Sequence, residues 1–386
     1  MRTVEVGDLS IGDGHAPKIM SVLNMSDNSG YKPSVHIDTD QAAAAVDEQL
    51  VPAGADIIDI GLQSANPKYE TKPVEYELER LDAAAEVIEK VESDTVFSLE
   101  TRYAEVAEEG IQRGFDIVND VCGFADPEMR PTVEAYDVPV VKMASPPDLE
   151  RPGALKTIDD VFEALERGGF TDRTIIDPAF GGWYDGKTFE DNWEMFRRLR
   201  EFRAFECPIL TATNREDFLG DLAGRPETDD QLEVSLAAAT LEVARGANVI
   251  RTHDTRETAD VVQVAHALSE ERTVRRNETE NEVAVSELFG ASRREANRHL
   301  SLSDRVTGRS EGSSTLTFVL TDVPDADVDV IHNAAELCEV TVGTAEDRVF
   351  LSGTVAALAA FLERLPVNTD ALETVVESVR ESITRE

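Results

Sequence analysis

From residue 18 to about residue 270, short apolar segments alternate with longer amphipathic segments. The short segments have the β-branched and aliphatic content that is typical of buried strands. They are Ile19–Asn24, Asp56–Ile60, Thr95–Glu100, Asp116–Asn119, Pro139–Lys142, Thr174–Asp177, Pro208–Thr211 and Asn248–Arg251. The segments between them show helical periodicity, for example at Thr39–Ala53, Val74–Val91, Ala104–Arg113, Ile158–Arg167, Asn192–Phe205 and Glu257–Leu268.

Eight strand–helix units in about 250 residues predict an α/β protein with the (β/α)8 TIM-barrel fold. A doubly wound open sheet is the alternative architecture. It is disfavoured because no GxGxxG motif follows the first strand, and because eight regular units favour closure of the sheet.

The pattern changes after the barrel, which we expect to occupy residues 1–270. Residues 271–313 are polar and have little core patterning, so they are predicted to be a linker with one or two short helices. Residues 314–386 predict a small α+β domain with the order β-α-β-β-α-α. This domain carries no motif that points to a chemistry, so we expect a docking, oligomerisation or ligand-sensing role.

Polar residues collect where the predicted strands end. They are Asn24, Asp59, Glu100, Asn119, Asp120, Asp177, Asn214, Arg215, Arg251 and His253. Any one of them could be a helix cap or a turn residue. In a barrel, however, the carboxyl ends of all strands meet at one rim, which is where active sites lie. The repeated coincidence therefore predicts a functional site at that rim.

The charge of the chain bears on its surroundings and partners. Acidic residues number 77 against 37 basic residues, a formal net charge of −40 at pH 7. Eight of the basic residues are lysines, and no lysine follows Lys187. Salt screens the mutual repulsion of such a surface, so the composition predicts adaptation to a salt-filled, halophilic cytoplasm. The same charge argues against a nucleic-acid partner, because the phosphate backbone would be repelled.

Cysteine spacing and hydropathy point to the same compartment. Cys122, Cys207 and Cys338 lie far apart without a CxxC pair, so neither a disulfide framework nor a zinc site is expected. The first residues lack the apolar segment of a secretory signal, and no stretch reaches the roughly 18 apolar residues of a membrane span. We therefore expect a soluble, cytoplasmic protein with no membrane partner.

Six segments carry a resemblance to a known family. They are SVLNMSDNSGYKPS (21–34), GADIIDIGLQSANP (54–67), FSLETRYAEVAEEGIQRGFDIVNDVCG (97–123), IIDPAFGGWYDGKTFEDN (175–192), TATNREDFLG (211–220) and ANVIRTHDTRET (247–258). In order and spacing, across residues 18–268, they resemble the dihydropteroate synthases, the folate-biosynthesis barrels of the pterin-binding family. The resemblance implies a transferase that joins a pterin-CH2-pyrophosphate to p-aminobenzoate, releases pyrophosphate and uses Mg²⁺. It also implies a homodimer.

The resemblance assigns the leaving pyrophosphate to residues at the first and last strands. Asn24 matches the asparagine that helps hold Mg²⁺ and pyrophosphate. Arg251 and His253 match the Arg-x-His anion clamp of the family, and alternate residues of a strand share a face. These three are the candidate catalytic residues, with Asn24 also the candidate metal ligand. The alternative for Arg251 is a structural ion pair with Asp254.

The remaining matches concern the pterin. Asn119 and Asp177 match the two residues that read the pterin edge, where a carboxylate can accept from neighbouring N–H groups. Their alternatives are a helix cap and a strand-ending turn. Arg215 matches an arginine that stacks beside the ring, and Glu100 stands where the family has Asp.

Four positions depart from the family pattern. Gln63 lies in the altered second-strand signature and is taken as substrate-binding. Ala65 and Asn66 replace the Thr and Arg that touch pyrophosphate, and Glu216 replaces a lysine over the pterin. Three functions therefore stay open: a divergent synthase, a pterin-binding paralogue with another acceptor or a methyl-transfer role, and a non-catalytic pterin-binding protein.

Overall fold

The computed structural model describes residues 2–26, 32–268, 274–276, 284–286, 292–301, 315–321, 323–345 and 348–385. The chain divides into two compact units, Met1–Glu287 and Leu288–Glu386. Part of the first connecting loop, including Asp27, lies outside the described residues. No described helix combines the length and the hydrophobicity that crossing a bilayer requires.

The first unit contains an eight-stranded parallel sheet with the order β8-β7-β6-β5-β4-β3-β10-β9. The strands are β3 (Lys18–Asn24), β4 (Ile57–Gly61), β5 (Val96–Thr101), β6 (Ile117–Asp120), β7 (Val140–Met143), β8 (Thr174–Asp177), β9 (Leu210–Thr211) and β10 (Val249–Thr252). The two edge strands also meet, through a parallel bridge between Ile176 and Ile209. The sheet is therefore closed into a (β/α)8 barrel, as predicted, and the open-sheet alternative is wrong.

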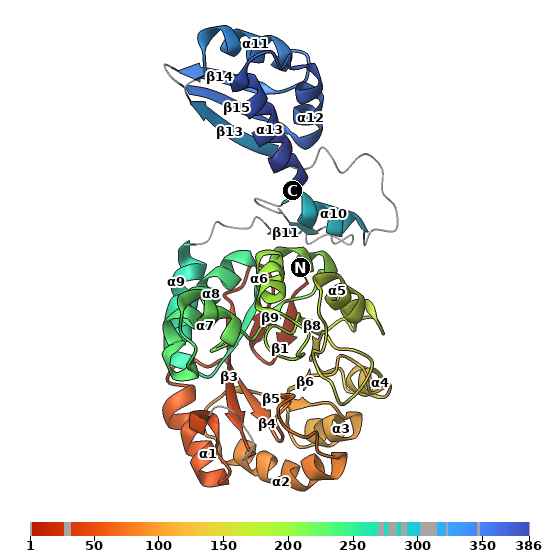
Figure 1. Ribbon diagram of the computed structural model, residues 1–386. Coiled ribbons are helices and arrows are strands. Elements are labelled where there is room, and N and C mark those ends of the chain that lie inside the picture. The colour runs from red at the N-terminus through yellow and green to blue at the C-terminus, as the bar shows by residue number, and fades with distance from the viewer. Residues whose placement is uncertain are drawn as a thin grey trace. The chain divides into compact units, whose positions relative to one another are not determined.

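Helices lie outside the strands (Figure 1). They are α1 (Thr39–Ala45), α2 (Val74–Lys90), α3 (Ala104–Gln112), α4 (Met129–Ala135), α5 (Ile158–Glu166), α6 (Phe189–Arg197), α7 (Asp217–Ala223), α8 (Leu232–Arg245) and α9 (Thr255–Leu268). Two of the helices predicted from periodicity change type along their length. The first continues as a π-helical segment, Val46–Leu50, and α6 is followed by a 3-10 segment, Leu199–Phe205.

The starts of α5 and α6 are fixed by the same local device. Thr157 and Thr188 each accept a hydrogen bond from the main-chain N–H three residues later, and the Asp at that position bonds back to the threonine's main chain. Such a capping box satisfies two N–H groups that would otherwise lack partners. It sets where each loop ends and so fixes the loop that follows β8.

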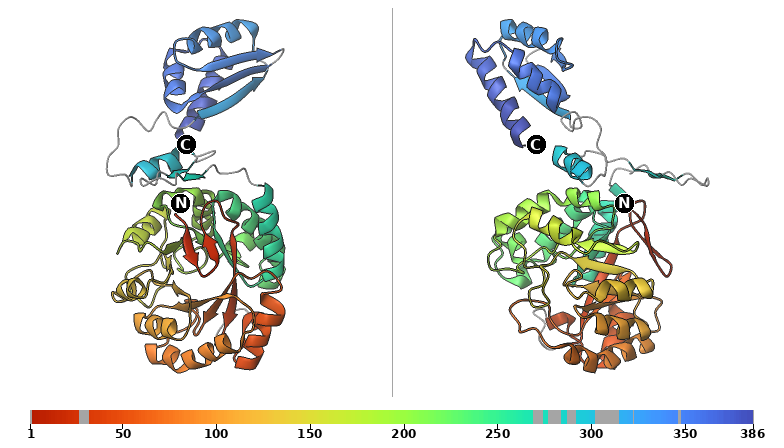
Figure 2. Two further views of the ribbon diagram at one scale, coloured as in Figure 1. Left: turned by 180° about the vertical axis from the view of Figure 1, so that it is seen from behind. Right: turned by 90° about the vertical axis from the view of Figure 1, so that its right-hand side faces the viewer.

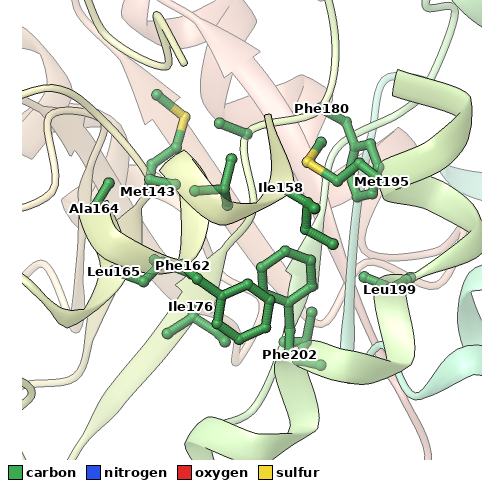
Figure 3. Close-up of a cluster of buried hydrophobic side chains, with 14 of the residues drawn as sticks. Met143, Ile158, Phe162, Ala164, Leu165, Ile176, Phe180, Met195, Leu199 and Phe202 are labelled. Atoms are coloured by element: carbon green, nitrogen blue, oxygen red, sulfur yellow. The ribbon is translucent and has the colours of Figure 1, made fainter. Parts of the chain in front are cut away.

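A hydrophobic cluster packs α5 and the segments after it against the strands (Figure 3). Phe162 and Phe202 stack with their ring centroids 4.6 Å apart and an angle of 9° between the rings. Ile176 of β8 and Phe180 of the loop after it belong to the same cluster. Close packing of these side chains holds the carboxyl end of β8 in place.

The amino end of the barrel is covered by a two-stranded hairpin that the periodicity did not predict. Strands β1 (Val4–Val6) and β2 (Leu9–Ile11) are antiparallel. Their buried side chains pack on one residue from each barrel strand, namely Met20, Ile57, Val96, Ile117, Val141, Ile175, Leu210 and Val249. These residues form an apolar floor, so functional side chains have room only towards the opposite end.

The second unit carries a three-stranded antiparallel sheet with the order β13-β15-β14. Its elements are β13 (Thr315–Thr321), α11 (Asp325–Ala335), β14 (Thr341–Ala345), β15 (Arg348–Thr354), α12 (Val355–Arg364) and α13 (Asp370–Arg385). Figure 2 shows the three helices on one face of the sheet. Their core is built by residues such as Ile331, Leu351 and Phe361.

Within residues 271–313, where a linker with short helices was predicted, the described residues contain three elements. They are strands β11 (Val274–Arg276) and β12 (Ala284–Ser286), which pair antiparallel, and helix α10 (Arg293–Ser301). The rest of that range lies outside the described residues.

Candidate active site

The barrel strands place a polar layer directly above the apolar floor. Because side chains alternate between the two faces of a strand, the residue two positions after each floor residue also faces inward. That layer consists of Val22, Asp59, Ser98, Asn119, Met143, Asp177, Ala212 and Arg251. Two positions further on are Asn24, Glu100 and His253. Most of the predicted site residues therefore belong to two consecutive inward layers.

Arg251 is the centre of a hydrogen-bonded charge network in the lower layer. Its Nε donates to Asp59 Oδ2 at 2.8 Å, and its Nη2 donates to Glu100 Oε2 at 2.5 Å. Asp59 is completely buried and also accepts from Ser98 Oγ and Asn119 Nδ2. The alternative of an Arg251–Asp254 ion pair is wrong, because Arg251 takes its partners from β4 and β5.

The network sets the protonation of its members. Burial opposes the charge of Arg251, but Asp59 and Glu100 outweigh it and raise the pKa of Arg251 above its usual value. Burial raises the pKa of Glu100 to about 7, although Arg251 acts in the opposite direction. The guanidinium is therefore permanently charged, whereas Glu100 exchanges protons near neutral pH.

His253 lies two residues beyond Arg251 and faces the first loop. Its Nδ1 is 2.7 Å from Ser34 Oγ, and its main-chain N–H donates to Asn214 Oδ1 at 3.0 Å. Burial, and after it the charge of Arg251, lower the pKa of His253 to about 3. The imidazole is therefore neutral at physiological pH, so it can offer a ligand a hydrogen bond but no positive charge.

Asn24 and Glu100 flank Gly61 at the upper layer. A Cβ at Gly61 would lie 3.3 Å from Asn24 Oδ1 and 3.8 Å from Glu100 Oε1. Amide and carboxylate oxygens are ligands that Mg²⁺ accepts, usually alongside water and substrate phosphate. No group of three or more His, Cys, Asp or Glu side chains within the described ranges could hold a metal by itself. The residues present thus fit a Mg²⁺ that shares its ligands with a substrate.

Asp177 belongs to the lower layer and ends β8, three strands away from Asn24 on β3. Its Oδ1 accepts from the main-chain N–H of Ala179 at 2.8 Å. Burial raises the pKa of Asp177 to about 6, while Arg251 and Lys187 act in the opposite direction. Asp177 and Asn119 therefore face the same interior from β8 and β6, with Arg251 near both.

Arg215 is held away from a free stacking position by Asp254. Its Nε and Nη2 donate to the two Asp254 oxygens at 2.8 and 3.0 Å, and Nη1 donates to the Thr228 carbonyl. Asn214 Nδ2 also donates to Asp254, at 2.9 Å. Asp254 thus ties the end of β10 to the loop after β9, and its arginine partner is Arg215 rather than Arg251, the partner in the alternative given above.

Gln63 and Asn66, from the altered second-strand signature, form hydrogen bonds with residues other than Arg251 and its partners. Gln63 is 4% exposed, and its amide bonds to Glu77 and to the main chain of Lys72. Asn66 is exposed, and its Oδ1 accepts from the Lys68 N–H in a local turn. The structure therefore brings Arg251, His253, Asn24, Glu100, Asn119 and Asp177 together, whereas Gln63 bonds to Lys72 of its own loop and to Glu77 of α2.

Comparison with known proteins identifies the family of the chain. A family model described as "Pterin binding enzyme" matches residues 20–253. The chain belongs to the pterin-binding enzyme family. The matched region begins in β3 and ends at His253, so it includes both inward polar layers.

Curated relatives in this pterin-binding family include bifunctional proteins. A probable bifunctional folylpolyglutamate synthase/dihydropteroate synthase of Haloferax volcanii is 34% identical over 272 residues, which are 67% of this chain and 31% of that protein. The dihydropteroate synthase of Clostridium beijerinckii is 30% identical, with 66% of this chain and 95% of that protein covered. The chain thus spans about a third of the length of the first two bifunctional relatives it matches, 31% and 32%.

Solved structures agree with the fold. A dihydropteroate synthase from Coxiella burnetii, in complex with pteroic acid, has a TM-score of 0.58 and 30% identity, with 69% of this chain and 98% of that chain covered. The enzyme from Thermus thermophilus, in complex with 4-aminobenzoate, has a TM-score of 0.57 and 27% identity, with 69% of this chain and 100% of that chain covered.

Several residues of the site were missed or underused at the level of sequence. Asp59 was noted as a strand-end residue but given no role, and Ser98, Ser34, Asp254 and Lys187 were not site candidates. For Asp59 and Ser98 a signal exists, because both lie two residues after a floor position in a strand. No local signal marks Lys187, which comes from a loop.

Proposed function

We propose that this chain is a dihydropteroate synthase, a transferase that joins a pterin-CH2-pyrophosphate to p-aminobenzoate and releases pyrophosphate. The observation that carries the proposal is the inward layer of Asn119, Asp177 and Arg251 in a barrel of the pterin-binding family. The names of several relatives and solved structures support the same activity. Folate biosynthesis is the corresponding biological role.

The pterin edge needs partners that match its donors and acceptors. Asp177 offers a carboxylate that can accept two N–H groups, and Asn119 offers both an acceptor and a donor. An unpaired polar group buried in the complex would cost about 1–3 kcal/mol, so such a matched edge selects for the pterin. Burial of Asp177 strengthens this selection, because water competes less for its oxygens.

The leaving diphosphate needs positive charge and hydrogen-bond donors. The Asp59 and Glu100 contacts use Nε and Nη2 of Arg251, which leaves Nη1 to face an anion. His253 adds a neutral donor or acceptor next to it. Mg²⁺, when bound, would neutralise part of the charge that develops on the diphosphate. Asn24 would hold it, with Glu100 Oε1 beside the amide.

A second function is favoured by one specific observation. Glu216 places a carboxylate where the family resemblance implies a lysine over the pterin, and Asn66 is exposed and makes a turn in its own loop. These differences favour a pterin-binding enzyme with a different acceptor amine. Its test is to replace p-aminobenzoate by other aromatic amines in the assay below and compare turnover.

The proposed activity is tested with the purified chain in molar KCl. The pterin pyrophosphate, p-aminobenzoate and Mg²⁺ are supplied, and dihydropteroate and pyrophosphate are measured. We expect turnover, and a loss of at least about 100-fold in kcat/KM for Asp177→Asn, because one edge of the pterin loses its charge partner. Asp185→Asn, an exposed carboxylate on the loop after β8, is the matched control and should be unchanged. A folded protein without turnover would reject the proposal.

We further propose that the active form is a cytoplasmic homodimer. The composition and the family resemblance support this form. Light scattering of the purified chain in molar KCl measures its mass, and a monomer that is fully active would contradict the dimer.

A further inference from the structure

Three charged side chains meet on the short turn that follows β8. The turn runs from Asp177 to Gly181 and contains a non-glycine residue, Ala179, with a φ of +56°. Asp177 bonds to the N–H of Ala179, and Lys187 Nζ donates to the carbonyl of the same residue at 3.0 Å. The carboxylate of Asp177 and the ammonium group of Lys187 therefore bind the N–H and the carbonyl of the same residue, Ala179.

Glu216 approaches the same turn from the loop after β9. A Cβ at Gly181 would lie 2.5 Å from Glu216 Oε2, so the carboxylate packs directly on the glycine. The main-chain N–H of Gly182 donates to this carboxylate. Gly181 has a φ of +107°, and its own N–H is held by Asn192 Oδ1 at 3.1 Å. Both the space and the backbone conformation that Glu216 requires are thus built into the loop.

The ammonium of Lys187 is well shielded for a lysine. Its residue is 9% exposed, whereas lysines are rarely buried without partners. Glu216, Asp177 and Asp191 all act on it electrostatically. The hydrogen bond from Nζ to Ala179 goes to a neutral carbonyl, so the group can still donate to a ligand.

We propose that Lys187 and Glu216 form a specificity-determining pair, which reads a donor–acceptor edge of a fused nitrogen heterocycle whose other edge is held by Asp177. Glu216 accepts an N–H of the ligand, and Lys187 donates to a ring nitrogen or carbonyl beside it. The inference rests on the proposed function for the class of ligand. It goes further by pairing Glu216, a predicted substrate contact, with Lys187, for which no contact was predicted.

The charges around the pair make its action depend on pH. Glu216 faces Asp217, Lys187 and Lys68, and burial raises its pKa to about 7. Burial lowers the pKa of Lys187 to about 8, against the opposite effects of Glu216, Asp177 and Asp191. Both groups are charged only between these two values, so binding of a pterin should be tightest in that window. Asp177, with a pKa of about 6, is already ionised there.

The test is equilibrium binding of 6-hydroxymethylpterin, a pterin without diphosphate, measured by calorimetry in molar KCl from pH 6 to 9. For Glu216→Gln and Lys187→Met we expect about tenfold weaker binding at pH 7.5. In Glu216→Gln the affinity for the pterin should no longer fall as the pH drops below about 7, because the group that takes up the proton is gone. Lys187→Arg should regain part of the affinity that Lys187→Met loses. In the double variant the loss should be clearly smaller than the product of the single losses, because the residues act as a pair.

Controls separate this inference from the proposed function and from misfolding. Glu190→Gln and Lys156→Met change exposed residues near the start of α6 and of α5, and should bind as the unmodified chain does. If the unmodified chain binds no pterin, the proposed function fails. If it binds and the variants at Lys187 and Glu216 bind equally well with the same pH profile, this inference fails alone. Multiplicative losses in the double variant would also overturn it.

Discussion

Replacing Arg251 by methionine tests whether the central charge network stabilises the barrel. Arg251 is 19% exposed, and its partner Asp59 is 0% exposed, so the variant leaves a buried carboxylate without its cation. Removing one member of a buried ion pair typically costs about 3–5 kcal/mol. Asp59 keeps its hydrogen bonds from Ser98 and Asn119, which offset part of that cost. We therefore expect a loss of about 3 kcal/mol in the free energy of unfolding.

Urea unfolding in molar KCl measures this loss, with tryptophan fluorescence as the probe. Both tryptophans, Trp183 and Trp193, lie in the first unit, so the signal reports on the barrel alone. The double variant Asp59→Asn/Arg251→Met should regain about 1–3 kcal/mol relative to the single variant, because the unpaired charge is gone. Arg256→Met, an exposed arginine on α9, is the matched control.

The loss should also depend on pH. The pKa of Glu100 is raised in the folded state, to about 7, so its protonation contributes stability that is complete below about 4.5 and lost as the pH rises through 7. Without Arg251 the carboxylates repel each other more strongly, so the variant should lose more stability at pH 8 than at pH 5. A loss under about 1 kcal/mol at pH 8, or an equal loss at both values, would refute the reasoning.

Three further outcomes are expected. Lys142→Met should lower the free energy of unfolding by about 2–4 kcal/mol in the fluorescence assay. The reason is that the fully buried Lys142 donates to three main-chain carbonyls at the end of α5. A change below about 1 kcal/mol would contradict this. Gly181→Ala should lower the stability more than Gly7→Ala and should also weaken pterin binding. Both glycines have a positive φ, but only a Cβ at Gly181 would collide with Glu216. Equal effects of the two variants would argue against this collision. Lowering KCl from about 1 M to 0.1 M lengthens electrostatic screening from about 3 to 10 Å, so the midpoint of thermal unfolding should fall; an unchanged midpoint would contradict a role for the net charge of −40.

The barrel was predictable because its signals are local. Each strand is a short apolar segment buried on both sides, and no observed end lies more than two residues from the predicted end. The hairpin β1–β2 has three residues in each strand, too few for periodicity to reveal it. The π-helical continuation of α1 has no sequence signature either, because its residues are ordinary helix formers.

Pairing between charged residues was not predictable to the same degree. The strand ends identified which residues would face one another, but not which carboxylate each arginine would take. Arg251 meets Asp59 because of the register between non-adjacent strands of the closed barrel, and Arg215 meets Asp254 because of a left-handed turn at Arg215. Both depend on the three-dimensional closure of the sheet, which a one-dimensional pattern does not contain.

The hairpin at the amino end has a consequence for the order of events during turnover. It covers the floor of the barrel, so molecules must enter and leave past the carboxyl ends of the strands. A molecule bound at the layer of Asp177 and Arg251 lies closer to the floor than a molecule that binds after it. For the function proposed above, the pterin should therefore bind first, and p-aminobenzoate should dissociate freely while the pterin stays in place. Steady-state inhibition patterns of a compulsory-order reaction would be its kinetic signature.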